Sequence, residues 1–330
     1  MDDQPASTEP QTPPGTIFTP HRRAQIMVTL VSIICALIFW WGGKWMHVPA
    51  QPGFQGSLLQ QSGWPLAMVA VYVMLAVSVV VATVIAGRSW FFAGLFAAAI
   101  GLMAVSIRGG PSRYVLFDAA AHGMARTVFL RLLFEQCLLF LAIVAIWSLF
   151  WSRYEAALPH APSDEKPRPD GMSTLLAVLG QTVIMGLIVL LLAPTDAKKQ
   201  DLVAVFIAGF VGSSLAEYLF PNQKAGRWYW VGPFLVGAVG YVMAYTNAAA
   251  WTNGVASGPL AALAHPLPLD YASAGIAGAV LGYYIGIGER TPTMTTMVLF
   301  GPVLTHFQFQ PRQPGPSAPE NSKPQNTQQK

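Results

Sequence analysis

The feature that most constrains this chain is a series of eight long apolar stretches separated by short polar connections. An α-helix needs roughly 20 mostly apolar residues to cross about 30 Å of hydrocarbon. Lipid forces the backbone to satisfy its own hydrogen bonds, and no ten-residue alternation indicates a β-barrel, so each stretch is expected to be helical. The predicted spans are residues 26–46, 65–86, 90–107, 129–151, 173–194, 202–220, 230–247 and 271–288.

The composition favours the same class of protein. Apolar residues make up 53% of the chain and charged residues 10%, whereas soluble domains carry about 25% charged residues. We therefore predict an all-α, polytopic transmembrane helix bundle of about eight spans, with a range of about seven to nine. Its expected surroundings are the lipid bilayer of a bacterial inner membrane or a plasma membrane, which it crosses as a multi-pass protein.

The distribution of Lys and Arg predicts the orientation. With the N-terminus inside, twelve of the 19 Lys and Arg residues lie on the cytoplasmic side, six lie on the other side, and Arg131 lies within a span. Positive residues concentrate in cytoplasmic loops, so both termini are expected in the cytoplasm. Residues 26–41 also suit the apolar region of a secretory signal, with Val48 and Ala50 at a cleavage site, but an uncleaved first span is preferred.

The segments outside the spans differ in composition. Both ends of the chain are polar and rich in Pro, Gln, Ser and Thr, which is typical of disorder. The loop 248–269 carries no charge and is expected to rest in the membrane interface. The predicted domains are a disordered cytoplasmic N-terminal tail (1–25), a transmembrane helical domain (26–290), an interfacial or re-entrant segment (291–307) and a disordered C-terminal tail (308–330).

The fourth span contains two charges, in the stretch FLRLLFEQC. At about 1.5 Å per residue, Glu135 lies roughly 6 Å inside the outer boundary of the hydrocarbon, and Arg131 lies one turn further out. In one interpretation, the two residues form an ion pair four residues apart at the rim, where Arg131 can extend to water. In the other, Glu135 faces the bundle interior and handles a proton or an ion.

Two further polar residues fall within predicted spans. Gln181 lies near the middle of the fifth span, and Glu217 lies about one turn from the inner end of the sixth. Together with Arg131 and Glu135 they form the candidate intramembrane polar site, although a helix–helix hydrogen bond is the plainer use of Gln181. Glu135 and Glu217 lie at different depths, which argues against a hydrolase that uses a pair of carboxylates.

Asp118, His122 and Arg126 recur every four residues just before the fourth span. On one continuous helix they would share a face, rotated away from Arg131. This face is either solvated or a polar entrance to the bundle. One His and one Asp are too few ligands to predict a metal site.

Glycines recur along the last span in SAGIAGAVLGYYIGIG. This spacing lets the backbone of a neighbouring helix approach closely, so we expect the span to lie inside the bundle or to contact a second copy or another membrane protein. The glycines predicted to serve helix packing are Gly275, Gly278, Gly282 and Gly286.

Motifs for known chemistry are missing from the sequence. We find no zinc, nucleotide, haem or nucleophile-elbow signature, so no metal and no cofactor are predicted. The basic residues form no run typical of nucleic-acid binding. No group of residues offers a nucleophile and a base together, so the sequence does not favour an enzyme. Two functions stay open: transporter- or channel-like movement of a small solute or ion, and a scaffold or sensor that acts through helix–helix contacts.

Overall fold

The computed structural model of the chain describes residues 20–46, 57–60, 63–86, 91–124, 126–157, 171–220, 226–247 and 259–288. Every regular element in these ranges is helical. The predictions for the segments 291–307 and 308–330 fall outside the described residues. The α-helices are α1 (Pro20–Met46), α2 (Trp64–Ala86), α3 (Phe91–Ser106), α4 (Ser112–Ala121), α5 (Thr127–Ala157), α6 (Gly171–Leu192), α7 (Lys198–Leu219), α8 (Gly232–Thr246), α9 (Pro268–Asp270) and α10 (Ile276–Gly288).

Three shorter elements join these helices. The 3-10 helix η1 (Gly226–Val231) leads into α8, and the 3-10 helix η3 (Pro259–Ala264) precedes α9. The π-helical turn η4 (Tyr271–Gly275) connects α9 to α10. Residues 268–288 therefore run as one continuous helical segment whose winding changes twice, from α to π and back to α.

A helix lies in each of the eight predicted spans, but the helices differ in length. Five of them, α1, α2, α5, α6 and α7, are long and apolar enough to cross a membrane. The others, α3, α8 and α10, contain 16, 15 and 13 residues, which is fewer than the roughly 20 that a full crossing needs. The membrane class is supported, and the count of eight crossings stays a prediction.

The first helix also extends beyond its predicted boundary. α1 begins at Pro20, although the tail was expected to continue to residue 25. Hydropathy marks only the part of a helix that lies in hydrocarbon, whereas the polar turn that contains His21, Arg22 and Arg23 stays helical outside it.

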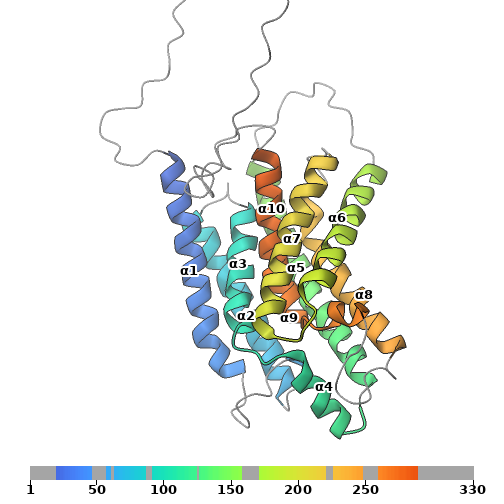
Figure 1. The fold of residues 1–330 in the computed structure, drawn as a ribbon. Helices are drawn as coiled ribbons and strands as arrows, with labels where there is room; N and C mark the ends of the chain where they lie inside the picture. The colour runs from blue at the N-terminus through green and yellow to red at the C-terminus, as the bar shows by residue number, and fades with distance from the viewer. Residues whose placement is uncertain are drawn as a thin grey trace, which may run out of the picture.

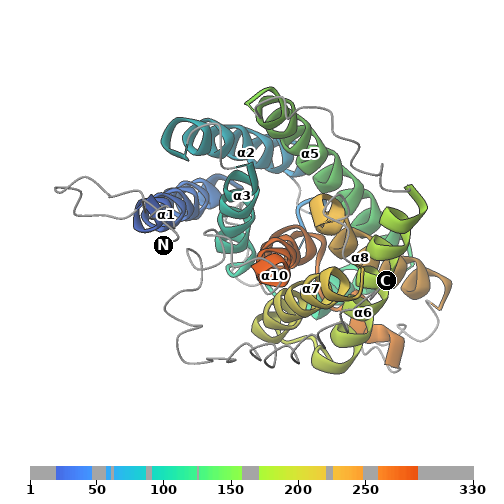
Figure 2. The ribbon, with the colours of Figure 1, turned by 90° about the horizontal axis from the view of Figure 1, so that it is seen from above.

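The helices form a single bundle whose axes are roughly parallel (Figure 1). α1 begins and α10 ends at the upper end of this view, and α4 lies across the lower end, where α1 ends and α5 begins. Viewed from above, α10 lies in the middle, with α3 and α7 beside it and α1 and α2 at the periphery (Figure 2). We use "lower end" below for the end that carries α4.

Glycines explain the central position of α10. A Cβ atom on Gly278 would lie 2.1 Å from the carbonyl oxygen of Phe206, and one on Gly282 would lie 2.0 Å from that of Phe210. Any side chain at these two positions would collide with the backbone of α7. The absence of side chains therefore lets α7 and α10 approach closely, as membrane helices with this spacing do.

The two outer glycines of the stripe also face neighbours within the chain. A Cβ atom on Gly275 would lie 2.7 Å from Cβ of Pro233, and one on Gly286 would lie 2.9 Å from Cβ of Glu217. All four glycines thus meet other helices of the same bundle. A second copy or another membrane protein at this helix stays a prediction.

The outer surface of the bundle is apolar. Val84 on α2 and Leu191 on α6 are each 77% exposed, and many other large apolar side chains on the long helices are exposed as well. Soluble proteins rarely expose such extended apolar surface. The arrangement therefore agrees with a bundle whose outer face contacts lipid.

Candidate functional site

Glu135 lies inside the bundle rather than at its rim. Its side chain is 0% exposed, and its carboxylate is held by a loop that is distant in sequence. The hydroxyl of Ser57 donates to Oε2, and the backbone N–H of Leu59 donates to the same oxygen at 3.2 Å. The other oxygen, Oε1, has no hydrogen-bond partner among the described residues. Of the two interpretations left open by the sequence, this geometry matches the interior-facing one.

Arg131 does not neutralise Glu135. It is exposed, and among the ion pairs within the described residues none joins it to Glu135. Arg131 instead lines a small pocket of about 40 Å³ with Gln60 and Asp118, which has room for a few water molecules. Because Gln60 follows Leu59, the same loop contacts both this pocket and Glu135.

A second buried carboxylate, Asp270, lies at the junction of α9 and η4. It is 0% exposed and accepts three hydrogen bonds: from the hydroxyl of Ser106, from Nζ of Lys198 at 2.5 Å, and from the backbone N–H of Leu267 at 2.8 Å. The bond to Leu267 resembles that of an acidic residue in the first turn of a helix, which binds a free backbone N–H there. Asp270 therefore links α3, α7 and the start of the α10 segment.

The third buried carboxylate, Asp201, lies one turn after Lys198 on α7. It is 1% exposed, yet neither of its carboxylate oxygens has a hydrogen-bond partner among the described residues. It lies within electrostatic range of Asp270, Lys198 and the partly exposed Asp196. A buried polar group without a partner is costly and therefore calls for an explanation.

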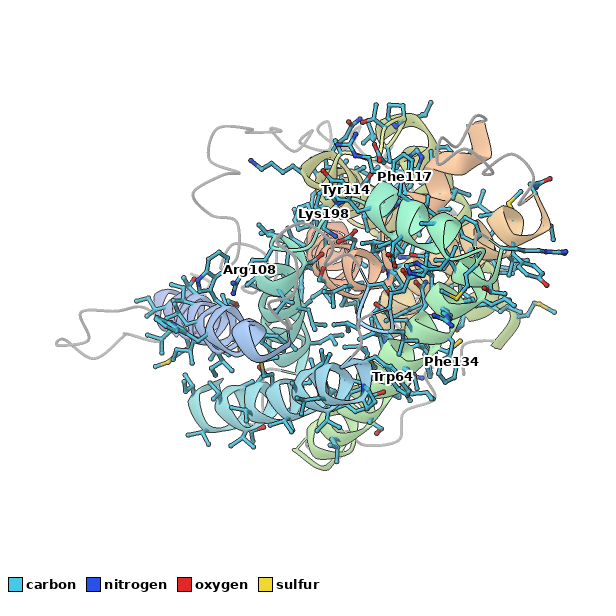
Figure 3. All side chains as sticks on the ribbon, turned by 90° about the horizontal axis from the view of Figure 1, so that it is seen from below. Trp64, Arg108, Tyr114, Phe117, Phe134 and Lys198 are labelled. Atoms are coloured by element: carbon cyan, nitrogen blue, oxygen red, sulfur yellow. The ribbon has the colours of Figure 1, made fainter. Side chains whose placement is uncertain are left out.

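We call Glu135, Asp201, Asp270 and Lys198 the acid–lysine cluster. Lys198 lies within electrostatic range of all three carboxyl groups. Seen from below, Lys198 lies near the middle of the lower end, between Arg108 and Tyr114 (Figure 3). If all three acids were ionised, one ammonium group would leave two negative charges uncompensated inside the protein, which is strongly unfavourable. The cluster is therefore suited to hold protons or another cation.

Two tyrosines line the cluster from neighbouring helices. Tyr241 on α8 lies within electrostatic range of all three acids, and Tyr271 on η4 lies within range of Asp201 and Asp270. Their rings meet edge to face with centroids 6.5 Å apart. The hydroxyl of Tyr241 donates to the carbonyl oxygen of Pro266 at 2.6 Å, and that of Tyr271 donates to the carbonyl oxygen of Leu263 at 2.8 Å.

The segment bound by these tyrosines folds into the lower end of the bundle. Residues 262–270 are buried, which differs from the expectation that the loop 248–269 rests in the interface; residues 248–258 lie outside the described ranges. Nδ1 of His265 donates to the carbonyl oxygen of Ala193 at 3.1 Å. Burial lowers the pKa of His265 below its ordinary value, because the charged imidazolium loses its hydration, and this hydrogen bond opposes the effect to a smaller extent.

The three residues expected on one helical face do not share one. α4 ends at Ala121, and Gly123, with φ of 69°, reverses the direction of the chain before α5. His122 contacts Asp118, with 3.5 Å between Nδ1 and Oδ1. Arg126 lies instead over the ring of Tyr245 at 4.5 Å.

The break at Gly123 also changes the relation between Asp118 and Arg131. The sequence-based expectation that Asp118 and Arg131 point in different directions holds only on one continuous helix. Gly123, in the left-handed region, ends that helix between the two residues. The two side chains line the same small pocket. Asp118 and Arg131 thus belong to one polar depression at the lower end.

Gln181 and Glu217 lie together in a different part of the bundle. Nε2 of Gln181 donates to Oγ of Ser213 at 3.0 Å and to the carbonyl oxygen of Tyr229 at 2.8 Å. The hydroxyl of Tyr229 donates to Oε2 of the buried Glu217 at 3.3 Å. No hydrogen bond within the described residues connects this group to Glu135.

Sequence reasoning missed three members of the acid–lysine cluster. Asp201 and Asp270 each precede a predicted span by one residue, and Lys198 lies in the connection between the predicted spans 173–194 and 202–220. One signal could have found Asp270, because it is the only Asp, Glu, Lys or Arg between Arg227 and Glu289. An isolated charge in so long an apolar stretch is a functional candidate by default.

The described residues offer little for other kinds of site. Within them, no group of three His, Cys, Asp or Glu side chains is placed to hold a metal ion. A groove of about 810 Å³ lies between α2 and α5, but apolar residues such as Leu75, Val80 and Leu141 line most of it. It contains no member of the acid–lysine cluster.

Comparisons with protein-family models, with curated proteins and with solved structures each found no match.

Proposed function

We propose that this protein is a multi-pass integral membrane protein that moves a small solute or an ion through the acid–lysine cluster. In this proposal the chain crosses a bacterial inner or plasma membrane eight times, with both termini in the cytoplasm. The lower end then faces the outside. The observation that carries the proposal is Asp201, a buried carboxyl group whose two oxygens have no hydrogen-bond partner in the described part of the chain.

The energetics of burial support a functional role for the cluster. A carboxylate buried in a membrane protein is expensive, and such residues generally face the interior and mark ion or solute pathways. An ion pair that only holds helices together needs one carboxylate for its lysine, whereas this cluster buries three carboxyl groups around Lys198. A protein that only holds helices together would do so more cheaply with apolar side chains.

The lower end also offers a route to the cluster. The small pocket lined by Gln60, Asp118 and Arg131 lies one helical turn from Glu135 along α5. The loop of residues 57–60 contacts both, since Ser57 and Leu59 bind the carboxylate. A shift of this loop would connect Glu135 to the pocket, which is how gating loops control access in many proteins.

The scaffold or sensor alternative receives less support. It relied on the glycine stripe of α10 as a contact surface, and these glycines meet α7 and other neighbours within the chain. The geometry therefore favours movement of a solute or ion over a scaffold.

The test is electrical recording from proteoliposomes adsorbed on a solid-supported membrane. Rapid exchanges of proton, sodium, amino-acid, sugar and carboxylate concentration are applied in turn, and osmotic re-swelling detects neutral solutes. We expect a transient current or re-swelling for at least one probe, reduced tenfold or more in Glu135→Gln and Lys198→Gln. The matched control Lys199→Gln, at the exposed neighbouring lysine, keeps most of the signal.

The proposal fails if no probe gives a signal above that of empty liposomes. It fails equally if Glu135→Gln and Lys198→Gln leave every signal unchanged while both variants are folded and inserted.

A further inference from the structure

We infer that Asp201 is a proton-binding site, and that the ion moved or coupled by this protein is the proton. This inference rests on the proposed function and names its coupling ion and the residue that carries it. Binding is a simple addition: a proton from the lower aqueous phase adds to the Asp201 carboxylate, giving a neutral carboxyl group without breaking any bond.

The hydrogen bonds divide the cluster into two fixed acids and one free acid. Asp270 accepts from Ser106, Lys198 and Leu267, and Glu135 accepts from Ser57 and Leu59. These donors stabilise the ionised form of each acceptor. Asp201 is as buried as the other two but receives no hydrogen bond within the described residues. Asp201 is therefore the acid whose charged form is least stabilised.

The charges around Asp201 point in the same direction. From its own helix and the preceding connection it faces Lys198 and Asp196, and from α9 it faces Asp270. Tyr271 of η4 and Tyr241 of α8 also lie within electrostatic range of Asp201, and both are neutral phenols at ordinary pH. The cation among these described groups, Lys198, is already bound to Asp270 at 2.5 Å. A proton on Asp201 removes a negative charge that Lys198, already paired with Asp270, offsets only in part.

A metal ion fits this site less well than a proton. Monovalent and divalent hard cations need several oxygen ligands around one point. Within the described residues no three His, Cys, Asp or Glu side chains are placed to surround an ion. A proton needs only one of the two free oxygens of Asp201.

Asp196 provides access to the site from the lower end. It precedes α7, its side chain is 25% exposed, and it lies 3.5 Å from the guanidinium of the exposed Arg113. Because Asp196 and Asp201 lie within electrostatic range of each other, the proton site is close to the aqueous surface on this side.

Infrared difference spectroscopy of the full chain in proteoliposomes tests the inference without measuring transport. A buried, protonated carboxyl group gives a C=O stretching band separate from those of amides and carboxylates. We expect such a band at neutral pH, and we expect it to disappear as the pH is raised. The frequency of this band should fall when the protein is labelled with ¹³C-aspartate. The label therefore distinguishes a band of Asp201 from one of Glu135 without any substitution.

Variants assign the band to one residue. We expect Asp201→Asn to remove it, Asp201→Glu to restore a carboxylic acid band, and the control Asp164→Asn, in the polar connection between the fourth and fifth predicted spans, to leave it in place. Lys198→Met should make the band persist to higher pH, because a nearby positive charge no longer favours the ionised acid.

Three results would overturn the inference: no acid band, a band that ¹³C-aspartate labelling or Asp201→Asn leaves unchanged, or a band abolished by sodium at constant pH. None of them depends on flux. A protein that carries a solute without protons would fail this test and still pass the electrical or swelling test, so the two failures are distinguishable.

Discussion

Nζ of Lys198 lies 2.5 Å from Oδ1 of Asp270, although 72 residues separate them in the chain. Their side chains are 10% and 0% exposed, so the pair is almost completely shielded from solvent. It joins the start of α7 to the start of the helical segment that contains α10.

Asp270→Asn should destabilise the protein, because it removes the carboxylate that is bound to the buried ammonium group of Lys198. Breaking a buried pair costs about 3–5 kcal/mol. Thermal unfolding of the purified protein in detergent measures the effect. The double variant Lys198→Met with Asp270→Asn should recover much of the loss, because it removes the unpaired charge.

Asp118→Asn is the matched control for this pair, since its partner His122 and its own side chain are 63% and 43% exposed. An exposed pair contributes only about 0–1 kcal/mol. Equal effects of the two single substitutions would show that the buried pair has no special role.

Ser57→Ala should release the loop of residues 57–60 from Glu135. A hydrogen bond to a charged group contributes about 1.5–3 kcal/mol, so the open form should become roughly ten to a hundred times more populated. The measurement is the labelling rate of Gln60→Cys by a membrane-impermeant thiol reagent, in a background that carries Cys35→Ala and Cys137→Ser. The control Ser148→Ala removes a hydroxyl that donates to the carbonyl oxygen of Ala145 within α5. An equal increase in the labelling rate of this variant would contradict the role given to Ser57.

Gly282→Ala should destabilise the contact between α7 and α10, because the new methyl group would lie 2.0 Å from the carbonyl oxygen of Phe210. Overpacking of this kind costs about 1–3 kcal/mol. Gly186→Ala on α6 is the control, since a Cβ atom there would meet nothing within 4 Å. Thermal midpoints of the two variants should differ, and a neutral Gly282→Ala would mean that the helices can separate without cost.

His265 should make the protein less stable in mild acid. Its pKa is lowered in the folded state by burial, so the unfolded chain binds the proton more readily. Stability is then fully present above the ordinary imidazole pKa of about 6.5 and falls as the pH drops through the lowered value. We expect His265→Gln to reduce the fall in thermal midpoint between about pH 8 and about pH 5. His122→Gln, at an exposed site, should leave this fall as it is in the unsubstituted protein; equal slopes for all three proteins would contradict the prediction.

Thiol labelling also tests the proposed topology. Cysteines introduced as Ser7→Cys and Ser322→Cys should react with an impermeant reagent from the same side of the membrane, and Gln60→Cys should react from the opposite side. Eight crossings require this pattern, because an even number returns the chain to its starting side. Labelling of positions 7 and 322 from opposite sides would show an odd number.

The sequence by itself determined the class of the protein and the position of its helices along the chain. Hydrocarbon thickness and backbone hydrogen bonding act on each stretch separately, so a local count of apolar residues is enough to locate a helix. The spacing of Gly278 and Gly282 likewise predicted a close helix contact, because a helix presents every fourth residue on one face.

The tertiary structure alone decided which polar side chains meet. Asp201, Asp270 and Lys198 look like ordinary boundary residues in the sequence, and only the packing of α3, α5, α7 and the α9 segment brings them to Glu135. The rotation of each helix about its axis decided that Glu135 turns to Ser57 rather than to Arg131. One left-handed residue, Gly123, placed Asp118 beside Arg131. Local hydropathy contains none of this information, because depth along a helix does not define which way its side chains face.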